Sequence, residues 1–196
     1  MYKPGDHVFY PKGGVFVIEK QSDKTIAGRE IRFFDLKSCD GKTKISIPIE
    51  NVDRVGVRPL ITNSELESCR KTWTPDLKIS KLHHKNRKSR FEAMRQSGSF
   101  TDMGKVVVTI HHLIKKTKAT FEEKRMYDQI RKRLVDEIEI VKSWSTGDAD
   151  NHLQAILDEA ITRKPPKNEE NEAGDDPAAI DAVAENEEEE AVAAVT

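Results

Sequence analysis

The chain has 196 residues, of which 34% are charged and 36% are hydrophobic, and its formal net charge is -1. This composition is typical of a soluble protein with one ordinary domain or two small ones, and it argues against one large core. No apolar run approaches the length that spans a bilayer, and the first residues lack the charged-then-apolar pattern of a secretory signal. We therefore expect a cytoplasmic protein without a membrane partner.

The near-neutral total hides a segregation of charge along the chain. Residues 165–196 carry eight Glu and three Asp against one Lys, a net charge of -10, so residues 1–164 sum to +9. Such asymmetry favours contact with nucleic acid, although a solubilising tail on an ordinary solvated surface would give the same pattern. Ala, Asp, Glu and Asn dominate the tail, which is predicted to be disordered because it cannot form a packed core.

The first sixty residues alternate short β-rich runs with turn signals that contain Pro or Gly. The runs are 7–10, 14–20, 30–37 and 44–49. Their length and spacing predict a small antiparallel β-barrel of the Tudor or SH3 type over residues 1–60. In the last run Ile45 and Ile47 share one face, while Lys44 and Ser46 face the other way.

From about residue 62 the apolar residues recur at the three- and four-residue spacing of a helix. A first helix is expected from a cap at Asn63 or Ser64 to the break at Pro75, and Thr120 with Glu123 forms a capping box for a later one. The remaining helices are expected over 82–95, 100–116, 120–144, ended by Gly147, and 150–164. The expected core stripes are Phe100, Met103, Val107, Ile110 and Ile114, then Tyr127, Ile130, Leu134, Ile138 and Val141. The predicted fold class is therefore α+β: a β-barrel (1–60), an all-α domain (61–164) and an acidic tail (165–196).

No motif for catalysis or metal binding is recognisable in this chain. Cys39 and Cys69 are isolated from each other, which predicts neither a disulfide framework nor a thiolate metal site. The histidine pairs at 83–84 and 111–112 would point about 100° apart on a helix, so neither pair can hold one ion. A phosphate-binding glycine loop and a nucleophile with its base are also lacking. We expect no enzyme, no cofactor and no metal.

Residues 80–95 carry six Lys or Arg and a single Glu. A helix through this run would turn Phe91 and Met94 inward. The cations that would then face outward are Lys81, Lys85, Lys88 and Arg95. A solvated lysine-rich face is common, but the positive charge of the body favours binding of nucleic-acid phosphates.

Three stretches resemble the CarD/CdnL family of bacterial transcription regulators: "GDHVFYPKGGVFVIEK", "IPIENVDRVGVRPLI" and "EEKRM". The Tyr10-Pro11 turn, the group at Pro48, Glu50 and Asn51, and the Ser97-Gly98 break also stand in the family's order. The resemblance covers residues 1 to about 162. It implies an N-terminal Tudor-like domain that binds the β subunit of RNA polymerase. It also implies a helical domain that contacts promoter DNA at the upstream edge of the minus-ten element, with no reaction catalysed.

Carried over by position, the polymerase contact falls on two strands. Its residues are Lys24, Thr25 and Ile26 on one and Lys44, Ser46 and Ile47 on the other. Basic residues are common in the family at the places of Lys24 and Ser46, so this chain keeps only one of the two charges. An exposed strand can also extend a partner's sheet through backbone hydrogen bonds.

The DNA contact implied by the resemblance falls on the basic run and on "EEKRM". Its residues are His83, His84, Lys85, Arg87, Lys88, Lys124 and Arg125. Family members place a tryptophan wedge near the start of the basic run, whereas this chain has a histidine there. Alignment on Ser97-Gly98 favours His84 for that place, and alignment on Phe91 and Met94 favours His83. Because imidazole has less apolar area than indole, we expect phosphate contacts to supply more of the affinity.

The main hypothesis is a monomeric, nucleoid-associated regulator that binds RNA polymerase and stabilises the open promoter complex, with low DNA sequence specificity. The alternative is a free-standing nucleic-acid-binding or compaction protein that uses its barrel to oligomerise. A module of a transcription-repair coupling factor is disfavoured, since the chain carries no helicase motor.

The acidic tail is expected to compete with DNA for the basic helix. Deleting residues 165–196 changes the net charge from -1 to +9 and should raise DNA affinity at low salt, because a tethered polyanion acts at high effective concentration. The difference should vanish by about 1 M salt, where the Debye length is about 3 Å. Titrations of full-length and truncated protein on one forked DNA measure it. Superimposable low-salt curves would leave the tail without a part in binding.

Overall fold

The computed structural model describes residues 2–26 and 28–163, and its N-terminal part is an antiparallel sheet. The predicted acidic tail, 165–196, lies outside the described residues. The strands are β1 (His7–Tyr10), β2 (Gly14–Ile26), β3 (Arg29–Ser38), β4 (Lys44–Pro48) and β5 (Arg58–Pro59), with a 3-10 turn, η1 (Ile49–Asn51), after β4. All four predicted β runs form strands, and β5 adds a short fifth.

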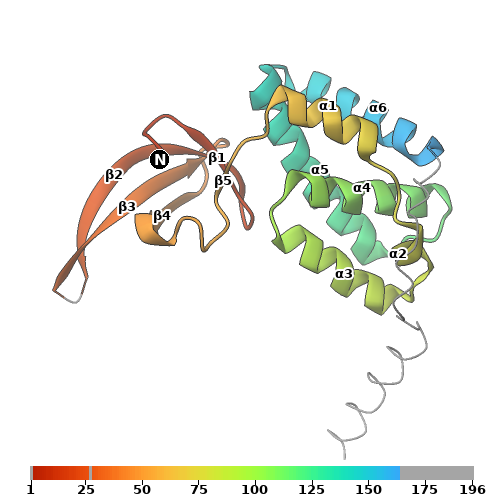
Figure 1. The fold of residues 1–196 in the computed structure, drawn as a ribbon, viewed down its shortest axis with the longest axis horizontal. Helices are drawn as coiled ribbons and strands as arrows, with labels where there is room; N and C mark the ends of the chain where they lie inside the picture. The colour runs from red at the N-terminus through yellow and green to blue at the C-terminus, as the bar shows by residue number, and fades with distance from the viewer. Residues whose placement is uncertain (1, 27, 164–196) are drawn as a thin grey trace, which may run out of the picture. The chain divides into compact units, whose positions relative to one another are not determined.

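The sheet has the strand order β4-β3-β2-β1-β5, and neighbouring strands are antiparallel. β4 and β5 are the two edges. No pairing joins them within the described residues, so the predicted barrel is an open sheet. The predicted fold class is otherwise confirmed, since six helices follow this sheet in the part of the chain that the structure describes (Figure 1).

β2 and β3 form a hairpin that is longer than the sequence predicted. The apolar pattern of β2 ends near Lys20, but residues 20–26 remain paired with β3. A β-bulge between Ile18 and Lys20 shifts the register there, which re-aims the side chains that follow. β4 pairs with β3 only at 33–37, so the end of the hairpin extends past β4 (Figure 1). Lys24 therefore lies within β2, beyond the end of its apolar pattern.

The helices occupy the rest of the described chain. They are α1 (Asn63–Thr72), α2 (Leu77–Lys81), α3 (His84–Gln96), α4 (Phe100–Lys115), α5 (Phe121–Lys142) and α6 (Thr146–Thr162). The expected helix over 82–95 forms as α3 but begins two residues later, because Leu82 and His83 have extended backbones between α2 and α3. Gly147 lies inside α6, and α5 ends instead at Ser143, whose φ is 54°. Within the described residues, no helix is both long and apolar enough to cross a bilayer.

The start of α1 is set by a cap that the sequence analysis misplaced. Thr62, rather than Asn63 or Ser64, is the N-cap: its hydroxyl accepts from the Glu65 N–H, and the Glu65 carboxylate accepts from the Thr62 N–H. The predicted capping box at Thr120 is confirmed at the start of α5.

The helical core is built from the predicted stripes of α4 and α5. Their residues are buried, except that Ile114 and Val141 are partly exposed. Trp73 is 1% exposed and stacks on Phe100 with ring centres 5.5 Å apart. A Cβ at Gly104 would lie 1.9 Å from the Trp73 ring, so the close approach of α1's end to α4 requires glycine there. Trp73 is thus a core residue.

A charged contact with a fully buried carboxylate, here called the Arg58–Glu137 clamp, joins β5 to α5. Arg58 donates from Nη1 and Nη2 to the two Glu137 oxygens at 2.7 and 2.9 Å, and from Nε to the Gly98 carbonyl at 2.8 Å. Glu137, 0% exposed, also accepts from the Ile61 N–H at 2.9 Å. The guanidinium lies 4.3 Å from the Phe9 ring centre. Both carboxylate oxygens are thereby satisfied.

A second contact supports the clamp at the β1–β2 turn. Arg133 of α5 donates to the carbonyls of Pro11 at 2.7 Å and Lys12 at 3.3 Å. Gly98 has φ of 69°, and a Cβ there would lie 2.5 Å from the Pro11 ring. The described residues accordingly form one compact unit. Independent folding of residues 1–60 stays a prediction.

The clamp predicts a specific pattern of stability changes. Arg58→Met should lower the free energy of unfolding by about 3–5 kcal/mol, because it leaves a buried carboxylate without its counter-charge. Arg58→Met/Glu137→Leu should recover much of that loss, less about 1–3 kcal/mol for the unpaired Ile61 N–H. Urea unfolding followed by circular dichroism measures both variants. A single variant as stable as wild type would show that the clamp contributes nothing.

Candidate protein and nucleic-acid interfaces

A polar network crosses three strands at the residues predicted to contact polymerase. Lys24 Nζ donates to Ser46 Oγ at 2.8 Å, and Ser46 Oγ donates to Asp35 Oδ1 at 2.5 Å. The hydrogen bond from Ser46 is the main cause that lowers the pKa of Asp35, with Lys24 assisting, while burial opposes it. The structure thus brings Lys24 and Ser46 together, and Ser46 holds the lysine in place.

The other predicted polymerase-binding residues differ in how exposed they are. Thr25 and Ile26 lie at the exposed end of the hairpin, where the Ile26 side chain is 50% exposed. Lys44 is exposed and lies 3.1 Å from Glu19. Ile47 is 6% exposed and packs in the core of the sheet, so only its backbone is available to a partner at the β4 edge.

The basic run presents two histidines at the start of α3. His83 is the N-cap residue and His84 the first helical residue, and their ring centres lie 4.1 Å apart. Both are exposed, as are Lys85 and Lys88 on the first turns of α3. Either histidine can therefore reach a ligand at this end of the helix.

Arg87 does not lie on this exposed surface, contrary to the sequence-based expectation. It is 8% exposed and donates from Nε and Nη2 to Glu123 at 2.7 and 3.1 Å, and from Nη1 to the Leu82 carbonyl. Burial raises the pKa of Glu123, but hydrogen bonds from Arg87 and the Thr120 N–H outweigh it, and the net shift is downward. Arg87 is thus a structural residue that fixes α3 against α5.

This buried pair places the first turns of α3 and α5 next to each other. Lys124 and Arg125 are exposed on α5, and Lys88 Nζ lies 2.7 Å from Glu122 Oε2. The exposed basic residues at the starts of the two helices are here called the basic face: His83, His84, Lys85, Lys88, Lys124 and Arg125. Six of the seven predicted DNA-binding residues belong to it.

Sequence reasoning missed an aromatic residue beside the basic face. Phe121, the first residue of α5, is 82% exposed. The signal was available, because Phe121 precedes Tyr127 by six residues, or about 240° of helix, and so falls off the apolar stripe. Lys116 and Lys118, exposed in the α4–α5 turn, were missed as well.

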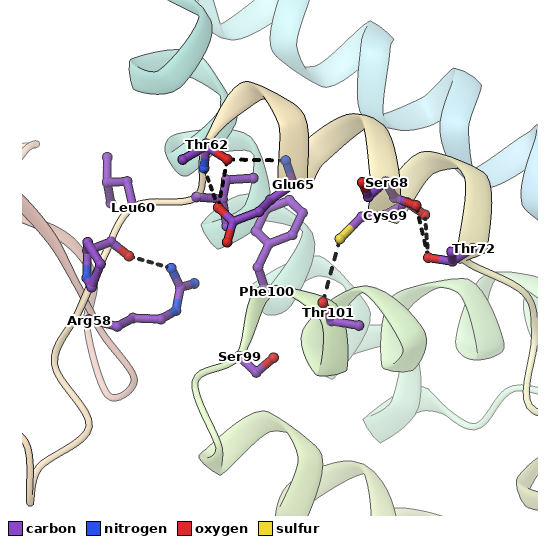
Figure 2. Close-up of a pocket in the computed structure, with 12 residues that line it drawn as sticks. Arg58, Leu60, Thr62, Glu65, Ser68, Cys69, Thr72, Ser99, Phe100 and Thr101 are labelled. Carbon is purple, nitrogen blue, oxygen red and sulfur yellow. Dashed lines mark hydrogen bonds between the residues drawn. The ribbon is translucent and has the colours of Figure 1, made fainter.

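The cavity shown in Figure 2 is separate from these surfaces. It has a volume of about 560 Å³ and lies where the segment 58–62 passes α1 and the start of α4. The Thr62 capping box borders it, and Cys69 Sγ lies 3.5 Å from Thr101 Oγ1. None of the predicted site residues lines it. The candidate site therefore lies on the surface.

The remaining histidines do not form a metal site. His111 is buried, with Nε2 3.0 Å from Asp158 and Nδ1 3.2 Å from the Tyr127 hydroxyl. Hydrogen bonds from Gln154 and His111 lower the pKa of Asp158 to about 2. Over residues 2–26 and 28–163, no group of three or more His, Cys, Asp or Glu could hold an ion.

Two known families match this chain. Residues 2–61, which include the Lys24–Ser46 network, match the CarD-like/TRCF RID domain, and residues 77–154, which include the basic face, match the CarD C-terminal domain. The fold and these matches define an RNA polymerase-interacting transcription factor. The chain belongs to the CarD/CdnL family.

Replacement of Arg87 by methionine should lower the free energy of unfolding far more than replacement of Lys85. Arg87→Met leaves the buried Glu123 carboxylate without its counter-charge and should lower the free energy of unfolding by about 3–5 kcal/mol. Lys85→Met, on the exposed face, should change it by no more than about 0.5 kcal/mol. Urea unfolding of both variants provides the measurement. Equal effects would contradict the assignment of Arg87 to the interior.

Proposed function

We propose that this protein binds the β subunit of RNA polymerase through the open edge of its sheet and promoter DNA through its basic face. The polymerase half rests on the family match of residues 2–61. Within that match, Lys24 presents a cation beside Ser46, and β4 presents a backbone edge to which a partner strand can add.

The DNA half of the proposal rests on one observation: the exposed cations of α3 and α5 form one face with an exposed aromatic ring beside it. Lysine and arginine that neutralise phosphates release counterions, which gives affinity without sequence preference. Phe121 supplies an apolar ring that a base freed from the duplex can stack on. In this chain we assign Phe121, together with His84, the contact for which relatives carry tryptophan.

The clamp would make DNA binding stronger when the protein is bound to polymerase. Because β5 and α5 are held by a buried ion pair, a molecule bound to polymerase would present its basic face to DNA at a fixed position and at high effective concentration. We propose that the DNA lies at the upstream edge of the minus-ten element. A ligand that binds melted DNA better than duplex shifts the population toward the open complex.

For the polymerase contact, Lys24→Glu should reduce binding about tenfold, or about 1.4 kcal/mol, because it reverses the exposed charge of the network. Lys3→Glu makes the same change in net charge before β1 and serves as the matched control. Biolayer interferometry on immobilised polymerase measures both full-length variants, with circular dichroism to verify folding. Undiminished binding by folded Lys24→Glu would remove Lys24 from the interface.

For the DNA contact, Phe121→Ala should weaken binding to a fork with an unpaired edge by about 1–3 kcal/mol and leave intact duplex unaffected. Lys85→Ala, which removes a phosphate contact, should weaken both DNAs and make the salt dependence shallower by about 0.9. Fluorescence anisotropy over a salt series separates the two effects. Equal loss on fork and duplex for Phe121→Ala would show that the ring does not stack on a base.

A further inference from the structure

We propose that Glu122 occupies, in the free protein, the position of a DNA phosphate on the basic face, and that a phosphodiester must displace it on binding. The inference rests on the proposed function and adds an anion site, built from Lys88, His84 and Arg125, together with its internal competitor. Glu122 thereby limits the affinity of the free protein for DNA.

The geometry centres on one carboxylate among several cations. Glu122 Oε2 lies 2.7 Å from Lys88 Nζ, and the two side chains come from different helices, α5 and α3. The hydrogen bond and charge of Lys88 lower the pKa of Glu122, and the charges of His84 and Arg125 add to that effect. Glu122 in turn raises the pKa of Lys88. The carboxylate thus lies within the electrostatic reach of three members of the basic face.

These surroundings fit a phosphate as well as they fit a carboxylate. Both anions accept hydrogen bonds from ammonium and guanidinium groups, and both are favoured near the N-terminal turn of a helix, where Glu122 lies. The two anions repel each other, so a phosphate can approach Lys88 only as Glu122 withdraws. Occupation of this position by Glu122 and by DNA is therefore mutually exclusive.

The neighbouring glutamate shows why Glu122 can be displaced. Glu123 is 3% exposed and locked to Arg87, so its removal would disturb the packing of α3 on α5. In the Lys88–Glu122 pair both side chains are largely exposed, at 60% and 67%. Exposed pairs are weak and screened by salt, so this one can exchange partners without a change in fold.

The consequence is a protein that binds DNA weakly on its own. Lys88 contributes to DNA affinity only after leaving Glu122, and the freed carboxylate repels nearby phosphates. Tight binding then requires the added effective concentration that polymerase provides. Glu122 is therefore a residue that determines specificity for polymerase-bound DNA over free duplex.

The test replaces Glu122 with its neutral isostere in the full-length protein. Glu122→Gln should bind the forked DNA about fivefold more tightly at about 50 mM salt and make the slope of log K against log salt steeper, because the variant has no freed carboxylate to take up a cation when a phosphate reaches Lys88. Asp128→Asn is the matched control: it makes the same charge change on α5, at an exposed position about 240° around the helix. It should leave the slope unchanged.

The same substitution made in a protein that lacks Lys88 tests the role of that lysine. In Lys88→Ala protein, Glu122→Gln should leave the salt slope unchanged, because no lysine remains to be released. If Glu122→Gln matched Asp128→Asn in affinity and slope, the inference would be overturned while the proposed function stood. Failure of the proposed function differs visibly, since wild type and every variant would then show no salt-dependent binding to DNA.

Discussion

The Arg58–Glu137 clamp is the constraint on which the arrangement of the other features depends. A fully buried carboxylate is costly unless every oxygen is paired, and here one guanidinium and one backbone N–H satisfy it. The same guanidinium contacts the Phe9 ring and the Gly98 carbonyl, so β1, β5, the α3–α4 turn and α5 meet at one side chain. The sheet and the helices are thus joined at this ion pair.

In the basic run one cationic side chain is buried in an ion pair and others are exposed, and the sequence alone does not distinguish the two. Arg87 and Lys88 are adjacent, yet one is locked inside by Glu123 and the other lies on the surface beside Glu122. The difference follows from helical geometry, since neighbours point about 100° apart. The internal pairs fix the helices, and the external cations remain available to a ligand. One basic run therefore supplies both a buried structural residue and exposed cations.

Much of the fold could be predicted from local patterns. Alternating residues gave the sheet, and the stripes from Phe100 and Tyr127 gave the helical core, because both signals arise from burial of one face. The ends of elements were less predictable. β2 continues to Ile26 through backbone pairing with β3 that leaves no apolar pattern, and Thr62 rather than its polar neighbours became the cap of α1.

The candidate site was predictable in position but not in detail. The basic run and the resemblance pointed to residues that are mostly exposed, but the burial of Arg87 depends on Glu123, 36 residues away. Likewise, Ser46 joins Lys24 only through strand pairing across β3. Contacts of this kind depend on tertiary structure. Phe121, in contrast, could have been identified, because its displacement from the stripe is visible in the sequence.

The open β4 edge also bears on how the protein behaves when no partner is bound. An unpaired strand is a template for self-association, and natural sheets protect such edges with short strands, lysine and proline. β4 has all three, since it is five residues long, begins at Lys44 and ends at Pro48, which has no N–H to donate. A second copy would bring the same cations to the same edge. Molecules without a bound partner should therefore stay dispersed instead of pairing edge to edge into extended sheets.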